Sequence, residues 1–158
     1  MSVANRPPVR PPRVIAVASG GGHWVQLLRL RPAFEGCEVT YVTVSDAYRA
    51  DVPGCRFRVV NDATRWNKFA LLRMALRLFW IMMRERPTVV ISTGAAPGYF
   101  ALRFGRWFGA RTIWLDSIAN VERLSMAGQL ARRYADLWLT QWPELARREG
   151  PRFAGAVL

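Results

Sequence analysis

Residues 14–24 read Val14-Ile15-Ala16-Val17-Ala18-Ser19-Gly20-Gly21-Gly22-His23-Trp24. The apolar residues 14–18 predict a buried strand and residues 24–30 predict a helix, so three glycines and the only histidine of the chain lie at the corner between them. Glycine lets the backbone turn tightly and approach a ligand, while the first amides of the helix are unpaired and partly positive. The corner therefore predicts a phosphate site with His23 beside the anion; the alternative is a tight turn without a ligand, in which His23 caps the helix or is partly buried.

The rest of the chain continues the alternation of strands and helices. Continuously apolar runs predict strands over residues 14–18, 39–44, 57–60, 88–92, 112–115 and 137–141, with helical segments between them. This pattern predicts an α/β fold with a Rossmann-like, doubly wound parallel sheet. We expect residues 1–12 to form a flexible tail rich in arginine and proline, and residues 13–158 to form a single domain.

In a doubly wound sheet, ligands bind beyond the carboxyl ends of the strands, which points to three further segments. They are Gly94-Ala95-Ala96-Pro97-Gly98, Asp116-Ser117 and Gln141-Trp142-Pro143. The first is predicted to be a second permissive glycine loop, or a simple connecting turn. Asp116 is predicted either to act on a bound substrate or to order its own loop.

The charge of the chain predicts a negatively charged partner. Its net charge is +12, with twenty-two arginines, a single lysine and eleven acidic residues. Nucleic acid, an anionic membrane surface or a phosphorylated substrate would each satisfy this balance. Cys37 and Cys55 have neither metal-ligand spacing nor a disulfide pattern, so we expect no metal site and a reducing cytoplasm.

Two alternatives are weaker on sequence grounds. A dinucleotide-binding module would need a third glycine where the chain has His23 and Trp24, although Asp46 lies near the position of a ribose-binding acid. Single-strand nucleic-acid binding would use aromatic residues on a sheet, whereas those of this chain follow helix spacing, so no nucleic-acid partner is expected.

The segment 68–85 predicts a long helix with apolar residues around most of its circumference. Arg73, Arg77 and Arg84 form one stripe and Trp80 lies on the apolar remainder. Each central arginine costs about 2.5–3.5 kcal/mol in a bilayer, so the helix is not expected to span a membrane. It is expected to cover the sheet with one side and to contact a membrane interface with the other, or to be an ordinary covering helix whose arginines reach water.

A second predicted helix, following Pro97-Gly98, mixes aromatic and cationic residues. Arg103, Arg106 and Trp107 belong to it, beside several phenylalanines. This mixture suits the headgroup zone of an anionic membrane, because each basic residue near such a surface contributes about 1 kcal/mol.

Four motifs then follow one another in a recognisable order. They are Ser19-Gly20-Gly21-Gly22-His23-Trp24, Ser92-Thr93-Gly94-Ala95-Ala96-Pro97-Gly98, Asp116-Ser117 with Arg123-Leu124-Ser125-Met126-Ala127-Gly128, and Ala135-Asp136 with Gln141-Trp142-Pro143-Glu144-Leu145. Together they resemble the acceptor-side subunit of two-component glycosyltransferases. That family includes the membrane-anchoring subunit of the enzyme that adds the second N-acetylglucosamine to the dolichol-linked precursor, and bacterial counterparts in capsule and exopolysaccharide synthesis.

The resemblance implies that the chain is the N-terminal half of a split, inverting GT-B glycosyltransferase. In this interpretation it holds a polyprenyl-diphosphate-linked sugar at the cytoplasmic face of the inner membrane, as a peripheral protein, during exopolysaccharide or capsule synthesis. It would recruit a small soluble subunit that binds the UDP-sugar donor. We expect the chain alone to be inactive and to bind no cofactor, because one α/β domain cannot form the two-domain cleft.

The resemblance also assigns roles to residues. Ser19, the three glycines, Gly94, Ala95, Pro97 and Ser117 would bind the acceptor diphosphate or sugar, and Gln141, Trp142 and Pro143 would contact the partner subunit. His23 and Asp116 are both candidates for the base that deprotonates the acceptor hydroxyl. In two respects the chain departs from its relatives: eukaryotic members begin with a membrane-spanning helix, and glutamate commonly stands at the position of Asp116. A non-catalytic membrane scaffold for the active subunit is the alternative.

Overall fold

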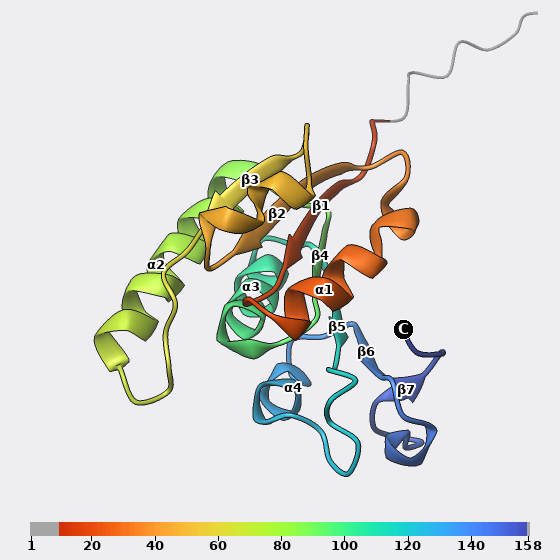
Figure 1. Ribbon diagram of the computed structural model, residues 1–158. Helices are drawn as coiled ribbons and strands as arrows, with labels where there is room; N and C mark the ends of the chain where they lie inside the picture. The colour runs from red at the N-terminus through yellow and green to blue at the C-terminus, as the bar shows by residue number, and fades with distance from the viewer. Residues whose placement is uncertain (1–9, 158) are drawn as a thin grey trace, which may run out of the picture.

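A sheet of seven parallel strands organises the protein, whose computed structural model describes residues 10–157 (Figure 1). The strands are β1 (Arg13–Val17), β2 (Glu38–Thr43), β3 (Arg56–Val59), β4 (Val89–Ser92), β5 (Arg111–Leu115), β6 (Leu137–Thr140) and β7 (Arg152–Phe153). Their order in the sheet is β3-β2-β1-β4-β5-β6-β7. The predicted fold class and the six predicted strands are confirmed, and β7 is an addition that sequence did not indicate. Most of the predicted tail lies outside the described residues.

Four α-helices and three short 3-10 helices connect the strands. They are α1 (Gly22–Arg29), η1 (Arg31–Phe34), η2 (Asp46–Asp51), α2 (Lys68–Glu85), α3 (Ala95–Trp107), α4 (Met126–Ala131) and η3 (Pro143–Leu145). The bounds of α2 are those predicted. The side chain of Asn67 caps α2 by accepting a hydrogen bond from Ala70 N at 2.9 Å, and Arg86 ends the helix in the left-handed conformation.

The helix α3 begins earlier than sequence indicated. Residues 95–98 form its first turn, so the predicted loop over residues 94–98 is wrong beyond Gly94. Proline is tolerated in a first turn because that turn needs no amide hydrogen from it. At Gly98, an added Cβ would overlap Ser92 Oγ and lie 3.1 Å from the Trp114 ring, so this glycine serves close packing of helix on sheet.

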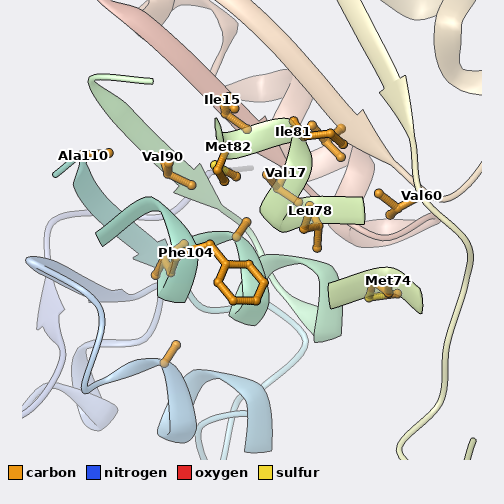
Figure 2. Close-up of a cluster of buried hydrophobic side chains, with 14 of the residues drawn as sticks. Ile15, Val17, Val60, Met74, Leu78, Ile81, Met82, Val90, Phe104 and Ala110 are labelled. Carbon is orange, nitrogen blue, oxygen red and sulfur yellow. The ribbon is translucent and has the colours of Figure 1, made fainter. Parts of the chain in front are cut away.

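Apolar side chains cover both faces of the sheet. Alternate residues of β1 point to opposite sides: Ile15 and Val17 join the cluster beneath α2, α3 and α4, whereas Val14 and Ala16 pack against α1. Figure 2 shows the first cluster, in which Leu78 and Met82 of α2 meet the sheet. Burial on both faces explains why the strands are continuously apolar rather than alternating.

The sheet changes winding direction between β1 and β4. From β1 the chain proceeds outward to β2 and β3, then returns to place β4 on the other side of β1. Helices leave the adjacent carboxyl ends of β1 and β4 on opposite faces of the sheet (Figure 1). In folds of this kind ligands bind in the crevice at such a switch point, which lies here between the beginnings of α1 and α3.

Candidate functional site

His23 lies at this switch point and joins the two helix beginnings. It follows the glycines after β1, in the first turn of α1, and its Nδ1 atom is 2.9 Å from the carbonyl oxygen of Thr93 at the end of β4. Thr93 Oγ1 donates a second hydrogen bond to the carbonyl oxygen of His23 at 2.7 Å. The imidazole rests directly on Gly94, where any Cβ would overlap its Nδ1 atom. Gly94 has φ +143°, a conformation that also favours glycine.

This contact fixes the tautomer of His23. A carbonyl oxygen can only accept a hydrogen bond, so Nδ1 carries the proton and Nε2 holds the lone pair when the ring is neutral. Among residues 10–157, no protein group forms a hydrogen bond with Nε2. The ring therefore offers an oriented proton acceptor to the crevice.

The glycine corner is held by Tyr48, a residue that sequence reasoning missed. Gly21 has φ +64° and its amide donates a hydrogen bond to Tyr48 Oη at 2.9 Å. The same hydroxyl lies 2.9 Å from where a Cβ on Gly20 would stand. Tyr48 belongs to η2, which follows the carboxyl end of β2, and this position was the available signal. Asp46 of the same turn forms an ion pair with Arg49 at 2.6 Å.

Two helices present amide groups at this crevice. Gly21 precedes α1 and Gly94 precedes α3, and in the part of the chain that the structure describes no side chain caps either helix and no acidic residue lies in either first turn. Ala95 has φ +65°, which is a strained conformation for alanine and is typical of functional sites. The two N-termini together provide a partly positive environment for an anion.

Asp116 is buried rather than open to a ligand. Its carboxyl group is 1% exposed and accepts four hydrogen bonds, from Trp114 Nε1 at 3.1 Å, Asn120 Nδ2 at 3.2 Å, and Ser125 N and Oγ at 2.8 and 2.5 Å. Ser125 in turn caps α4 by accepting from Gly128 N at 2.8 Å. The geometry corresponds to the loop-ordering role among the predicted alternatives: Asp116 fixes residues 116–125 and the start of α4.

A buried polar network connects that loop to the histidine helix. Gln141 Nε2 donates to Gln26 Oε1 at 2.7 Å and to the backbone oxygen of Asp116 at 2.9 Å, while Gln26 Nε2 donates to Ser117 Oγ at 3.2 Å. Gln141 is 2% exposed, so its prediction as a partner-contact residue is wrong. The Gln141 side chain makes its hydrogen bonds inside the fold, because α1, β6 and the loop after β5 meet there. Trp142 donates from Nε1 to the Ile118 carbonyl at 2.7 Å and is half-buried, whereas Pro143 is exposed at the start of η3.

The outer side of α2 is apolar and basic. Phe69 is 87% and Leu76 62% exposed, and further apolar side chains on this side are Leu72, Phe79, Trp80 and Met83. At 100° per residue these fall on one stripe, and Arg73, Arg77 and Arg84 border it along one edge. We call this set the α2 outer face. Its aromatic surface continues onto α3, because Phe79 packs on Phe104 of that helix at a ring distance of 5.6 Å and on Phe108, directly after it, at 5.3 Å.

The predicted cations of α3 are engaged within the fold. Arg106 forms an ion pair with Asp136 at 2.8 Å, and the half-buried Arg103 lies over the Trp107 ring at 5.2 Å. Burial alone would raise the pKa of Asp136, but hydrogen bonds from Thr112 and the nearby Arg106 outweigh it and hold the pKa below its ordinary value. Of the predicted surface, Arg73, Arg77, Trp80, Arg84 and Trp107 are exposed without such ion pairs in the region 10–157. None of the described helices has the length and apolar character needed to cross a bilayer.

Comparisons with known proteins match most of the chain. A family model described as "Oligosaccharide biosynthesis protein Alg14 like" matches residues 36–157. The protein named UDP-N-acetylglucosamine transferase subunit ALG14 of Eremothecium gossypii is 27% identical over 182 aligned positions, which include 94% of this chain and 81% of that protein. The protein of the same name in Yarrowia lipolytica is 32% identical over 74 residues, covering 43% of this chain and 34% of that protein.

Solved structures show the same fold at low identity. MurG of Acinetobacter baumannii superposes with a TM-score of 0.75 and 14% identity over 90% of this chain. The UDP-N-acetylglucosamine 2-epimerase of Rickettsia bellii superposes with a TM-score of 0.70 and 8% identity over 93% of it. The chain spans only 45% of each of these solved chains, so it corresponds to one half of their architecture.

Proposed function

The chain belongs to the Alg14-like family of oligosaccharide biosynthesis proteins, and from this premise we propose that it is the acceptor-binding subunit of a two-subunit, inverting glycosyltransferase. A second, soluble subunit would bind the UDP-sugar. The relatives are named as UDP-N-acetylglucosamine transferase subunits, which makes UDP-N-acetylglucosamine the first donor to test. A partner subunit is supported by the printed names of the relatives, and the chain covers 45% of the MurG architecture, of which that partner would supply the remainder.

One observation carries the proposal: two uncapped helix N-termini and an oriented imidazole converge at the switch point of the sheet. The first-turn amides of α1 and α3 would bind the diphosphate of a polyprenyl-diphosphate-linked sugar. Ser19 and the glycines 20–22 let the backbone approach it, and the hydrogen bond from Gly21 to Tyr48 would exchange for one to a phosphate oxygen.

His23 would then act as the general base. The acceptor hydroxyl oxygen attacks the anomeric carbon of the UDP-sugar, the bond from that carbon to the UDP oxygen breaks, and the hydroxyl proton moves to His23 Nε2. Thr93 orients the ring through Nδ1 and supports the positive charge that develops on it. Asp116 is a positioning residue here, because its carboxyl group is occupied by its own loop.

Membrane contact is proposed for the α2 outer face. Its exposed apolar stripe with a row of arginines along one edge is the arrangement of an interfacial helix on an anionic surface. Such a surface suits a peripheral protein that takes its acceptor from the cytoplasmic side of the inner membrane. Exopolysaccharide or capsule synthesis is the proposed context.

The first experiment tests catalysis. The chain would be co-expressed with a candidate donor-binding subunit from the same organism. Transfer from UDP-N-acetylglucosamine to a polyprenyl-diphosphate sugar would be measured for the pair and for each chain alone. His23→Ala should reduce turnover of the pair by about 10²–10⁴-fold without weakening association, because general bases contribute that much. Val25→Ala, an exposed change on α1, is the matched control. Unchanged turnover in His23→Ala would favour a non-catalytic scaffold.

The second experiment tests the membrane surface. Leu76→Asp, in the exposed stripe, should abolish flotation with vesicles rich in anionic lipid while leaving the melting temperature within about 2 °C. Val25→Asp places the same charge on α1, which covers the other face of the sheet, and should float like the unmodified protein. Equal flotation of both variants would remove the α2 outer face from the proposal.

A further inference from the structure

An apolar pocket lies beside the anion crevice and belongs to none of the features above. Its volume is about 300 Å³, and it opens between α2, α3 and α4. Leu71 of α2, Ala96 and Phe100 of α3, and Ala127 and Leu130 of α4 contribute to its wall. Of the described residues that line it, Arg65 alone is charged.

The pocket and the switch-point crevice share the first turn of α3. Ala96 lines the pocket and lies in the first turn of α3, two residues after Gly94, on which the His23 ring rests. One helical turn rises about 5.4 Å, so an anion bound at this N-terminus would be within that distance of the pocket wall. The wall of the pocket that α4 forms is positioned by Asp116. The Asp116 carboxyl group accepts a hydrogen bond from Ser125, and Ser125 caps α4.

The charge and surroundings of the pocket indicate what it would hold. Arg65 lines the pocket as an exposed residue, with its guanidinium 4.5 Å from the centre of the Trp66 ring and Nη1 3.9 Å from Met126 Sδ, and its charge would favour an anionic group near the pocket. Leu71 belongs to the same helix as the exposed Phe69, so the pocket lies at the N-terminal end of the α2 outer face. An apolar chain that begins at a diphosphate would pass through the pocket on its way to that surface.

We propose that this pocket binds the first isoprene units of a prenyl diphosphate, and so selects a lipid-linked acceptor by its chain as well as by its diphosphate. The proposal rests on the proposed function, because the diphosphate is taken to occupy the crevice. It adds a separate apolar subsite, built by Ala96, Ala127 and Leu130, whose contribution is independent of the sugar.

The test compares two probes with the same ionisable groups, methyl diphosphate and geranyl diphosphate, by calorimetry on the full chain. Geranyl diphosphate should bind at least about tenfold more tightly, since burial of about two methylene groups already supplies that factor. Ala127→Phe fills the pocket and should cancel the gain, leaving methyl diphosphate affinity within about twofold. Ala33→Phe, at an exposed position in η1, is the matched control and should keep the gain.

A rim variant covers the case in which Ala127→Phe fails to fold. Leu130→Gln changes a side chain that is exposed at the edge of the pocket, and it should reduce the gain about threefold or more by removing apolar contact. Melting temperatures confirm that both variants are folded.

The outcomes separate the two proposals. Binding of methyl diphosphate with no gain from the geranyl chain overturns the prenyl subsite and leaves the proposed function standing. If the affinity gain from the geranyl chain persists in Ala127→Phe and this variant no longer binds the partner subunit, the prenyl subsite is overturned in favour of a protein interface. Binding of neither probe overturns the subsite and the diphosphate site together.

Discussion

Replacing Gly94 with alanine should displace the His23 ring from its position over Gly94. An added Cβ would overlap the imidazole Nδ1, so the ring must leave the Thr93 carbonyl oxygen. The backbone at φ +143° is strained for alanine by about 1–3 kcal/mol, and the lost hydrogen bond costs about 0.5–1.5 kcal/mol. Together these predict a destabilisation of about 2–4 kcal/mol, or about 5–15 °C in melting temperature for a chain of this size.

The matched control is Gly36→Ala. Gly36 also has a positive φ, +76°, but an added Cβ there would meet nothing within 4 Å, so this variant isolates the backbone cost at about 1–2 kcal/mol. The excess loss in Gly94→Ala over the control measures the His23 contact together with the larger backbone cost at φ +143°, a conformation nearly restricted to glycine. Differential scanning calorimetry gives both values.

A second readout reports on His23 itself. Because the chain has a single histidine, its imidazole nitrogen resonances can be observed without assignment. The unmodified protein should show a proton on Nδ1, and Gly94→Ala should shift the ring toward the opposite tautomer or an averaged signal, with a matching loss of transferase activity in the two-subunit enzyme. Equal melting temperatures for the two glycine variants, with unchanged imidazole signals, would refute the reasoning.

The remaining predictions concern the carboxyl groups. Asp136→Asn should lower stability by about 1 kcal/mol at pH 7, a figure discounted because the ion pair is partly exposed. Because folding lowers the pKa of Asp136, its carboxylate stabilises the fold fully above the unfolded-state value of 3.8. This stabilisation is lost as pH falls below that value and through the folded-state pKa, so the difference in melting temperature from the unmodified protein should shrink progressively in that acidic range. Asp116→Asn should cost about 2–3 kcal/mol by breaking buried hydrogen bonds, as urea unfolding would measure. If Asp116→Asn is as stable as the unmodified protein and yet inactive, Asp116 takes part in catalysis and does not only order its loop.

Local sequence patterns were sufficient for the fold class and for the strand-to-helix corner that holds the three glycines. The buried strands of a doubly wound sheet are continuously apolar, and their lengths and punctuation give the order of elements. Three glycines between a strand and a helix permit a tight turn of the backbone, and this freedom needs no partner from elsewhere in the chain. Gly20 to His23 therefore lie where the sequence indicated, at the carboxyl end of β1.

Residues with two acceptable local roles were not resolved by the sequence. Pro97-Gly98 is a turn signal, but it is also compatible with the first turn of a helix. The structure has the helical turn, because Gly98 there packs closely against Ser92 and Trp114. Gln141 follows a strand and looked available to a partner, but Gln26 and Asp116 meet it in the interior.

By itself the sequence determined the class of fold, six of the strands to within about one residue and the residue types at the switch point, because these follow from short-range periodicity and backbone freedom. Only the tertiary structure decided which atom of His23 is free, that Asp116 serves its loop, and that an apolar pocket adjoins the crevice. Each of these depends on groups brought together from distant parts of the chain, as Thr93 is brought to His23 and α4 to α3. Hydrogen-bond partners and burial are properties of that packing, and no local pattern encodes them.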